Sequence, residues 1–284
     1  MAMAARAAYL AATRVALAAL ERNALPDAVT RRLTRLLLAQ RLRLGYLPSS
    51  SSSAPLHLHH LLLFAHALEE MPIAIETEKA KDQHYELPTT FFKLVLGRNL
   101  KYRENELSNV EIIVADISKF EMERSFDRII SIEMFEHMKN YKALLKKLSR
   151  WMKEDSLLFV HYFCHKTFAY HFEDNNEDDW ITRYFFTGGT MPSANLLLYF
   201  QDDVSIANHW LVSGTHYART SEEWLKRMDK NITSIRPIFE KTYGKESATK
   251  WIAYWRTFFI SVAELFGYNN GDEWMVAHFL FRKK

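Results

Sequence analysis

The sequence has few cysteines, which stabilise small secreted proteins as disulfides, and no long apolar run of the kind that crosses membranes. Its 284 residues include a single cysteine, Cys164, which excludes a disulfide framework and is compatible with a reducing, cytoplasmic compartment. The best apolar run, residues 61–68, lies between histidines and glutamates and is too short to span a bilayer. The net charge of +3 has both signs interspersed, so no binding to nucleic acid is predicted.

Glycine is absent from a long stretch of the chain. None occurs between Gly97 and Gly188, although this stretch contains the first segments with the pattern of buried strands. A dinucleotide or adenosyl ligand needs glycines at the first strand-to-helix turn, because only glycine lets the backbone come close enough. The usual half-site for such a cofactor is therefore not encoded.

The N-terminal region is helical by pattern. Residues 1–45 contain eight Arg, no Lys and only two acidic residues, a composition that organelle transit peptides share. After Pro26, however, leucines repeat at helical spacing, which favours an amphipathic helix that belongs to the fold. Residues 47–55 are rich in serine and bounded by prolines, as in a flexible linker.

From residue 108 onward the pattern changes to short apolar runs that alternate with helical segments. The strand-like runs and the helix among them are residues 110–117, 126–133, 140–153 and 156–164. Such alternation predicts an α/β fold with a parallel sheet covered by helices. We therefore divide the chain into an N-terminal helical region, residues 1–100, and an α/β domain, residues 101–284.

Two acidic residues end predicted strands. Asp116 ends the run that begins at Val110, and Glu133 ends the run that begins at Phe126. Ligands of open parallel sheets bind beyond the carboxyl ends of the strands, so both acids lie where chemistry would take place. Alternatively, each acid caps the helix that follows. The residue types alone do not decide between these interpretations.

The segment "IEMFEHM" is richer in chemistry. Glu133 and Glu136 lie three residues apart on one helical face, and His137 follows. Two carboxylates and an imidazole can hold an amine, accept its proton or bind a metal. A zinc hydrolase would need a different spacing and a third ligand, so we predict no metal. Acids near a helix N-terminus are also favoured by the dipole, which leaves a structural role open.

Histidine and aromatic residues are plentiful after residue 155. His161, His165 and His171 lack convincing metal spacing, so we expect them to line a core or a pocket. Aromatic residues make up 14% of the chain and include seven Trp. They suit either a pocket for a flat organic ligand or a large aromatic core.

Long blocks of the sequence resemble a known family. They include "FDRIISIEMFEHMKNY", "MKEDSLLFVHYFCHKTFAYHFE" and "YWRTFFISVAELFGYNNGDEWMVAHFLF". From about residue 24 to the end, the chain is similar to the plant coclaurine N-methyltransferase group, which belongs with the cyclopropane-fatty-acid synthases. The resemblance implies a Rossmann-like class I methyltransferase sheet of seven strands with an N-terminal helical extension. It also implies S-adenosylmethionine as cofactor and a small amine, such as a tetrahydroisoquinoline, as substrate.

The resemblance also assigns roles to single residues. Glu133, Glu136 and His137 match the catalytic carboxylates and histidine, which hold the amine and take up its proton. The residues that match the cofactor side are Tyr102, Asp116, Ile117 and Ile132. Tyr217 and Trp224 match the pocket region only loosely. The resemblance leaves room for a homodimer.

One part of the family pattern is missing. In the family, the residue that matches Tyr102 is followed by two βα units with the glycine-rich loop and the acceptor for the ribose hydroxyls. Here Arg103 follows directly. We therefore predict a deletion of two βα units, ~30 residues each, between these residues, so that the first strands of the sheet are missing. Methyl transfer would then be impaired; the alternative is a non-catalytic isoform or gene-model fragment that keeps the amine-binding or dimer half.

Overall fold

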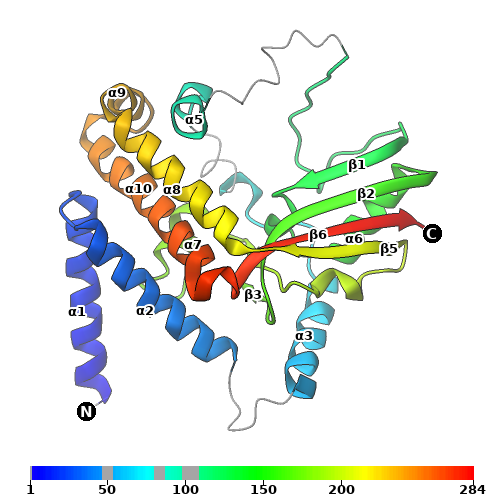
Figure 1. Cartoon of the computed structure of the whole chain (residues 1–284), viewed down its shortest axis with the longest axis horizontal. Coiled ribbons are helices and arrows are strands. Elements are labelled where there is room, and N and C mark those ends of the chain that lie inside the picture. Colours follow the sequence, from blue (N-terminus) through cyan, green and yellow to red (C-terminus); the bar gives the residue numbers. More distant parts are fainter. Residues whose placement is uncertain (1, 47–53, 80–86, 98–108) are drawn as a thin grey trace.

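The computed structural model describes residues 2–46, 54–79, 87–97 and 109–284 (Figure 1). In chain order the elements are α1 (Ala2–Glu21), α2 (Asp27–Gly45), α3 (Ala54–Glu69), α5 (Thr89–Leu96), β1 (Phe126–Ile132), the 3-10 helix η1 (Phe135–His137), α6 (Tyr141–Arg150), β2 (Met152–His165), β3 (Tyr170–His171), α7 (Trp180–Phe185), β4 (Thr190–Met191), η2 (Leu196–Tyr199), β5 (Val204–Val212), α8 (Gly214–Lys230), α9 (Ile232–Tyr243), α10 (Lys245–Gly267), η3 (Tyr268–Gly271) and β6 (Trp274–Lys283). Tyr102 and the predicted domain boundary at residue 100 lie outside the described residues.

Four of the described strands form the main sheet, in the order β1-β2-β6-β5. The predicted strand–helix–strand unit is confirmed, since β1 and β2 are parallel and α6 connects them. The sheet is mixed, because β6 runs antiparallel to both of its neighbours. A separate pair, β3 and β4, forms a short two-stranded sheet.

The strand predicted from Val110 is wrong. Residues 110–116 have no regular secondary structure and are drawn without an arrow before β1 (Figure 1). Their apolar side chains are exposed: Val110 by 48%, Ile112 by 56%, Ile113 by 50% and Val114 by 96%. In the described part of the chain β1 is an edge strand, but this apolar run does not pair with its free edge. Strand propensity alone does not form a strand when no pairing is made.

One face of the sheet is covered. The helix α6 begins at Asn140, whose Oδ1 accepts a hydrogen bond from the backbone N of Ala143 at 2.8 Å, as an N-cap should. Its buried residues Tyr141, Leu144, Leu145 and Leu148 join a core with alternate residues of β2 and β6. The members from the strands are Leu158, Val160, Tyr162, Cys164, Met275, Ala277, Phe279 and Phe281.

The opposite face is covered only at one end. There Phe163 packs with Phe266 of α10, at a ring distance of 6.2 Å. Toward the β1 edge, Ile130 and Ile132 are 66% and 60% exposed. Parallel strands in α/β proteins are normally covered on both faces. The open face therefore marks where covering structure is missing from the described residues.

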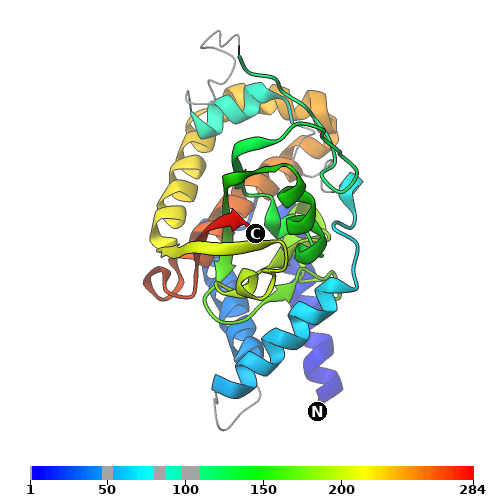
Figure 2. The same ribbon diagram turned by 90° about the vertical axis from the view of Figure 1, so that its right-hand side faces the viewer.

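The N-terminal helices pack on the C-terminal ones. Figures 1 and 2 show α8 (yellow) beside α10 (orange), with α1 and α2 (blue) close to α10. Arg31 of α2 forms ion pairs with Glu222 of α8 and Glu264 of α10, at 2.5 and 2.9 Å. The structure therefore agrees with the prediction that this amphipathic helix belongs to the fold. None of the described helices is both long and apolar enough to cross a membrane.

Hydrogen exchange tests the loss of the expected strand. The backbone amides of residues 110–116 should exchange rapidly, because the segment is exposed and not paired in the sheet, whereas those of β2 and β6 should be protected. Mass spectrometry of peptic fragments at neutral pH would measure this, with β2 as internal reference. Strong and uniform protection across residues 110–116 would contradict the structure.

Candidate active site

The candidate site is built around Glu133, the first residue after β1. Its φ is 52°, a left-handed backbone conformation that is uncommon for residues other than glycine. Its backbone N donates to the carbonyl oxygen of His161 at 3.1 Å, so the turn starts while still bonded to β2. Backbone strain of this kind is typical of functional sites.

Two side chains from different elements bind the Glu133 carboxylate. Nε2 of His161, on β2, lies 2.8 Å from Oε1, and the hydroxyl of Tyr217, on α8, donates to Oε2 at 3.0 Å. A carboxylate only accepts hydrogen bonds, so the proton of His161 belongs on Nε2. The Glu133 side chain is still 34% exposed and remains open to a ligand.

A second histidine contacts the first. Nδ1 of His161 lies 2.9 Å from Nε2 of His278, and the two rings are 4.9 Å apart. These residues face each other in the register of β2 and β6. Burial, and then the charge of His161, lower the pKa of His278 below its ordinary value.

Glu136 differs from Glu133 in its surroundings. It lies on η1 and is 1% exposed, and neither carboxyl oxygen has a hydrogen-bond partner among the described residues. Burial, and then the charge of nearby Glu133, raise the pKa of Glu136 well above its ordinary value. Two adjacent carboxyl groups with such different environments can take different roles: burial favours the neutral form of Glu136, whereas Glu133 is partly exposed and accepts two hydrogen bonds.

The turn that carries both acids is fixed by Lys139. This lysine is 1% exposed, and its Nζ donates to the carbonyl oxygen of Gly189 and to Oγ1 of Thr190, both at 2.8 Å. Nδ1 of His171 also lies 2.8 Å away. Burial lowers the pKa of Lys139 to about 8. The lysine thus fastens η1 to the small sheet of β3 and β4.

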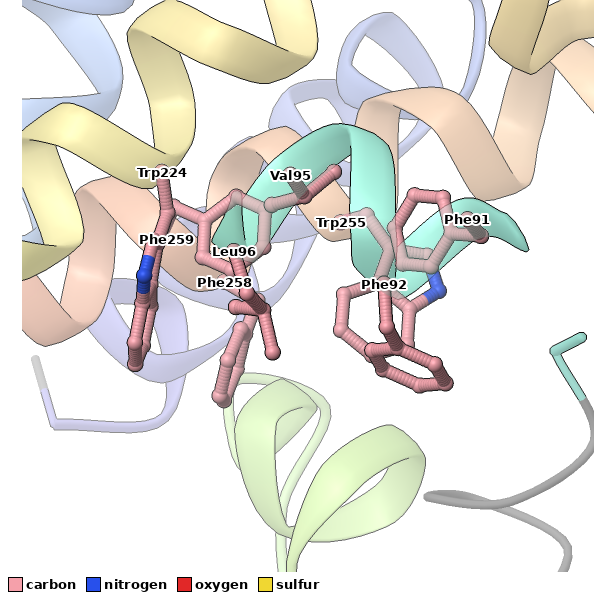
Figure 3. A pocket seen from close by; sticks show the side chains of 8 residues that line it. All are labelled: Phe91, Phe92, Val95, Leu96, Trp224, Trp255, Phe258 and Phe259. Carbon is pink, nitrogen blue, oxygen red and sulfur yellow. The ribbon is translucent and has the colours of Figure 1, made fainter. Parts of the chain in front are cut away.

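An aromatic cavity of about 170 Å³ lies between α5, α8 and α10 (Figure 3). It is lined by Phe91, Phe92, Val95, Leu96, Trp224, Trp255, Phe258 and Phe259. Ring contacts lead from it to the acidic site: Trp224 lies 6.3 Å from Tyr217, and Phe258 lies 6.1 Å from Phe186. His137 in turn stacks on Phe186 at 6.1 Å. The aromatic residues therefore form both a core and a pocket.

The geometry agrees with comparisons to known proteins. The family model of mycolic acid cyclopropane synthetase matches residues 103–269. The (S)-coclaurine N-methyltransferase of Thalictrum flavum subsp. glaucum is 39% identical, over 93% of this chain and 94% of that protein. Pavine N-methyltransferase of the same plant is 52% identical over 63% of this chain and 51% of its own length. The crystal structure of coclaurine N-methyltransferase bound to N-methylheliamine and SAH has a TM-score of 0.88 and 37% identity, and the match covers 94% of this chain and 98% of that one.

The chain belongs to the mycolic acid cyclopropane synthetase family. By family it is an S-adenosylmethionine-dependent methyltransferase with an α/β class I methyltransferase fold. Its similarity to plant N-methyltransferases indicates an N-methyltransferase. The resemblance stated from the sequence is thereby confirmed. Among the described residues, no group of three or more His, Cys, Asp or Glu is arranged to hold a metal ion.

The predicted cofactor-side residues do not assemble around Glu133. Oδ1 of Asp116 accepts from the backbone N and Oγ of Ser118, at 2.9 and 2.7 Å, so this acid caps a turn. Ile117 packs against the core on the covered face, whereas Ile132 points to the open face. In the part of the chain that the structure describes, no hydrogen bond or ion pair joins Asp116 to Glu133. The other carboxylate oxygen of Asp116, Oδ2, is buried and has no hydrogen-bond partner among the described residues. The assignment of these residues to the cofactor side stays a prediction.

The sequence alone missed three members of this site. His161 was noticed only as one of several histidines, and Lys139 and His278 were not singled out. The signal for Lys139 was available, because it follows the acidic motif within one helical turn. His278 gave none, since it lies 117 residues from His161 and meets it only through strand pairing.

A substitution at Glu136 tests whether this residue is neutral. The pKa of Glu136 is higher in the folded than in the unfolded state. The wild type therefore loses stability as the pH rises from the unfolded-state pKa toward the folded-state pKa of this residue. The glutamine in Glu136→Gln does not titrate. The free energy of unfolding of this variant should therefore rise relative to that of the wild type between pH 4 and pH 8. Urea unfolding at several pH values would measure the difference.

Glu273→Gln provides the control with the opposite sign. Burial raises the pKa of Glu273, but hydrogen bonds from Tyr46, Asn269 and Lys166 outweigh it and hold the pKa below its ordinary value. This carboxylate stabilises the fold above the unfolded pKa, so its loss should cost ~1–3 kcal/mol at neutral pH and less in acid. For each variant, the difference in the free energy of unfolding from the wild type is followed with pH. If this difference changes in the same direction for both variants, the raised pKa of Glu136 is wrong.

Proposed function

We propose that this chain is an N-methyltransferase of the coclaurine type, acting on a small aromatic amine, in which a missing block impairs cofactor binding and leaves the amine half intact. The observation that carries the proposal is the charged Glu133 beside the neutral Glu136, next to an aromatic cavity. The cytoplasmic location and the homodimer expected from the sequence stay predictions.

Glu133 supplies what a protonated amine requires. An ammonium N–H donates a charge-assisted hydrogen bond to the carboxylate, which is stronger than a bond between neutral groups. The carboxylate can then take the proton on Oε, which leaves a lone pair on the nitrogen. His161 and Tyr217 keep the carboxylate in place from two sides. Because Glu136 is neutral, the site carries one negative charge for one cation.

The cavity supplies what the flat part of the amine requires. Trp224, Trp255 and Phe258 present ring faces and edges from α8 and α10 (Figure 3). Aromatic pairs in offset or edge arrangements gain about 0.5–1.5 kcal/mol beyond burial. Tyr217 connects the two parts, since its hydroxyl binds Glu133 and its ring edge faces Trp224. We infer an amine that carries an aromatic ring, such as a tetrahydroisoquinoline.

The cofactor half lacks its usual parts. No glycine occurs between Gly97 and Gly188, and β1 is an edge strand among the described residues. The alignment with the Thalictrum relative runs over 344 positions, more than the 284 residues of this chain, which supports a block present there and absent here. The family match begins at residue 103, next to the deletion that we propose between Tyr102 and Arg103.

Calorimetric titration separates the two halves of this proposal. S-adenosylmethionine should bind very weakly or not at all, because three or four lost hydrogen bonds at ~1–3 kcal/mol each remove micromolar affinity. Tetrahydroisoquinoline should bind, and Glu133→Gln should weaken it at least ~10-fold because the charge is lost. Glu154→Gln, an exposed residue at the start of β2, is the control. Micromolar binding of the cofactor would overturn the first half, and no binding of the amine the second.

A tryptophan in the cavity tests the aromatic contact. Trp224→Leu should weaken tetrahydroisoquinoline by roughly 5- to 10-fold, because an aromatic contact of about 1 kcal/mol or more is lost. Piperidine, which lacks the aromatic ring, should bind both forms equally. Trp251→Leu is the matched control, since Trp251 stacks on Tyr243 outside the cavity lining. If Trp224→Leu weakens the binding of both amines equally, the aromatic ring of tetrahydroisoquinoline does not contact Trp224.

A further inference from the structure

His278 has a contact that the family roles given above do not use. Its Nε2 lies 2.9 Å from Nδ1 of His161, whose Nε2 lies 2.8 Å from Oε1 of Glu133. Two strands and one turn thus contribute a chain of polar contacts, from β6 through β2 to the turn after β1. The far end of this chain lies on the sheet face that is open toward β1.

The directions of these hydrogen bonds follow from the charge of Glu133. Its carboxylate accepts from Nε2–H of His161, so a neutral His161 has only a lone pair on Nδ1. That lone pair needs a donor, and Nε2–H of His278 is within reach. The reverse direction would place the lone pair of Nε2 against the carboxylate at 2.8 Å, which is repulsive.

The surroundings of His278 favour its neutral form. Its ring lies 5.1 Å from the ring of Phe159 and 5.3 Å from that of Trp210. The titratable groups that face the histidine pair and its carboxylate are Glu133 after β1, Glu136 on η1 and Tyr217 on α8. Of these, Glu136 and Tyr217 have pKa values raised by burial, and burial therefore favours their neutral forms.

We propose that His278 is a positioning residue that keeps His161 neutral by donating to its Nδ1, so that the negative charge of Glu133 remains available to the amine. If this donor is lost, Nδ1 can take a proton from water on the open face. His161 then becomes a cation paired with Glu133 and competes with the bound ammonium. The proposal deepens the amine site described above and rests on it.

Imidazole NMR tests the proposal without any amine. In ¹⁵N-histidine-labelled protein, His161 should be neutral at pH 7 with its proton on Nε2. In His278→Ala its titration midpoint should rise by about one pH unit or more. His278→Gln restores an N–H donor and should return the midpoint toward that of the wild type. His209→Gln, a histidine stacked on Phe279 on the covered face, should leave it unchanged.

The pH profile of amine binding gives a second readout. At pH 6, tetrahydroisoquinoline should bind His278→Ala about tenfold more weakly than the wild type, with little difference at pH 8, because His161 is protonated only in the more acidic solution. An imidazolium at His161 in the wild type at pH 7, or equal midpoints in wild type and His278→Ala, would overturn the proposal. If no amine binds to any form, the proposed function fails, while the NMR titration still decides the role of His278.

Discussion

The hydrogen-bonded carboxylate of Glu133 holds the candidate site together. It connects the turn after β1 to β2 through His161 and to α8 through Tyr217, while its backbone N stays bonded to β2. A side chain tied to three elements loses little further entropy when a ligand binds, which is the basis of preorganisation. The left-handed φ of 52° persists because these contacts over-determine the position.

The division of charge between two adjacent acids depends on burial. Glu136 is enclosed by η1 and the small sheet that Lys139 fastens to it, so its ionised form would lack both water and a cation. Glu133 has two donors and access to solvent. One turn of chain thus contains two carboxyl groups in unlike surroundings, and burial favours the neutral form of Glu136.

Local pattern predicted much of this structure, and pairing explains what it missed. The runs at 126–133, 140–153 and 156–164 became β1, α6 and β2, because their periodicity matches the faces that they bury. The equally apolar run at 110–117 did not form a strand, since a strand needs pairing and this run is not paired with the free edge of β1. Likewise, the acidic motif was visible locally, but His278 enters the site only through the register of β2 and β6.

The edge at β1 also separates the two halves of the function. The groups assigned to the amine come from the turn after β1, from β2 and β6, and from the helices α5, α8 and α10, which are packed in a core of their own. Of the residues expected on the cofactor side, Asp116 accepts hydrogen bonds from Ser118 through Oδ1, and Ile117 packs against the core. The loss that we propose at this edge would remove the neighbours of one half-site, while the hydrogen bonds around Glu133 stay within β1, β2 and α8.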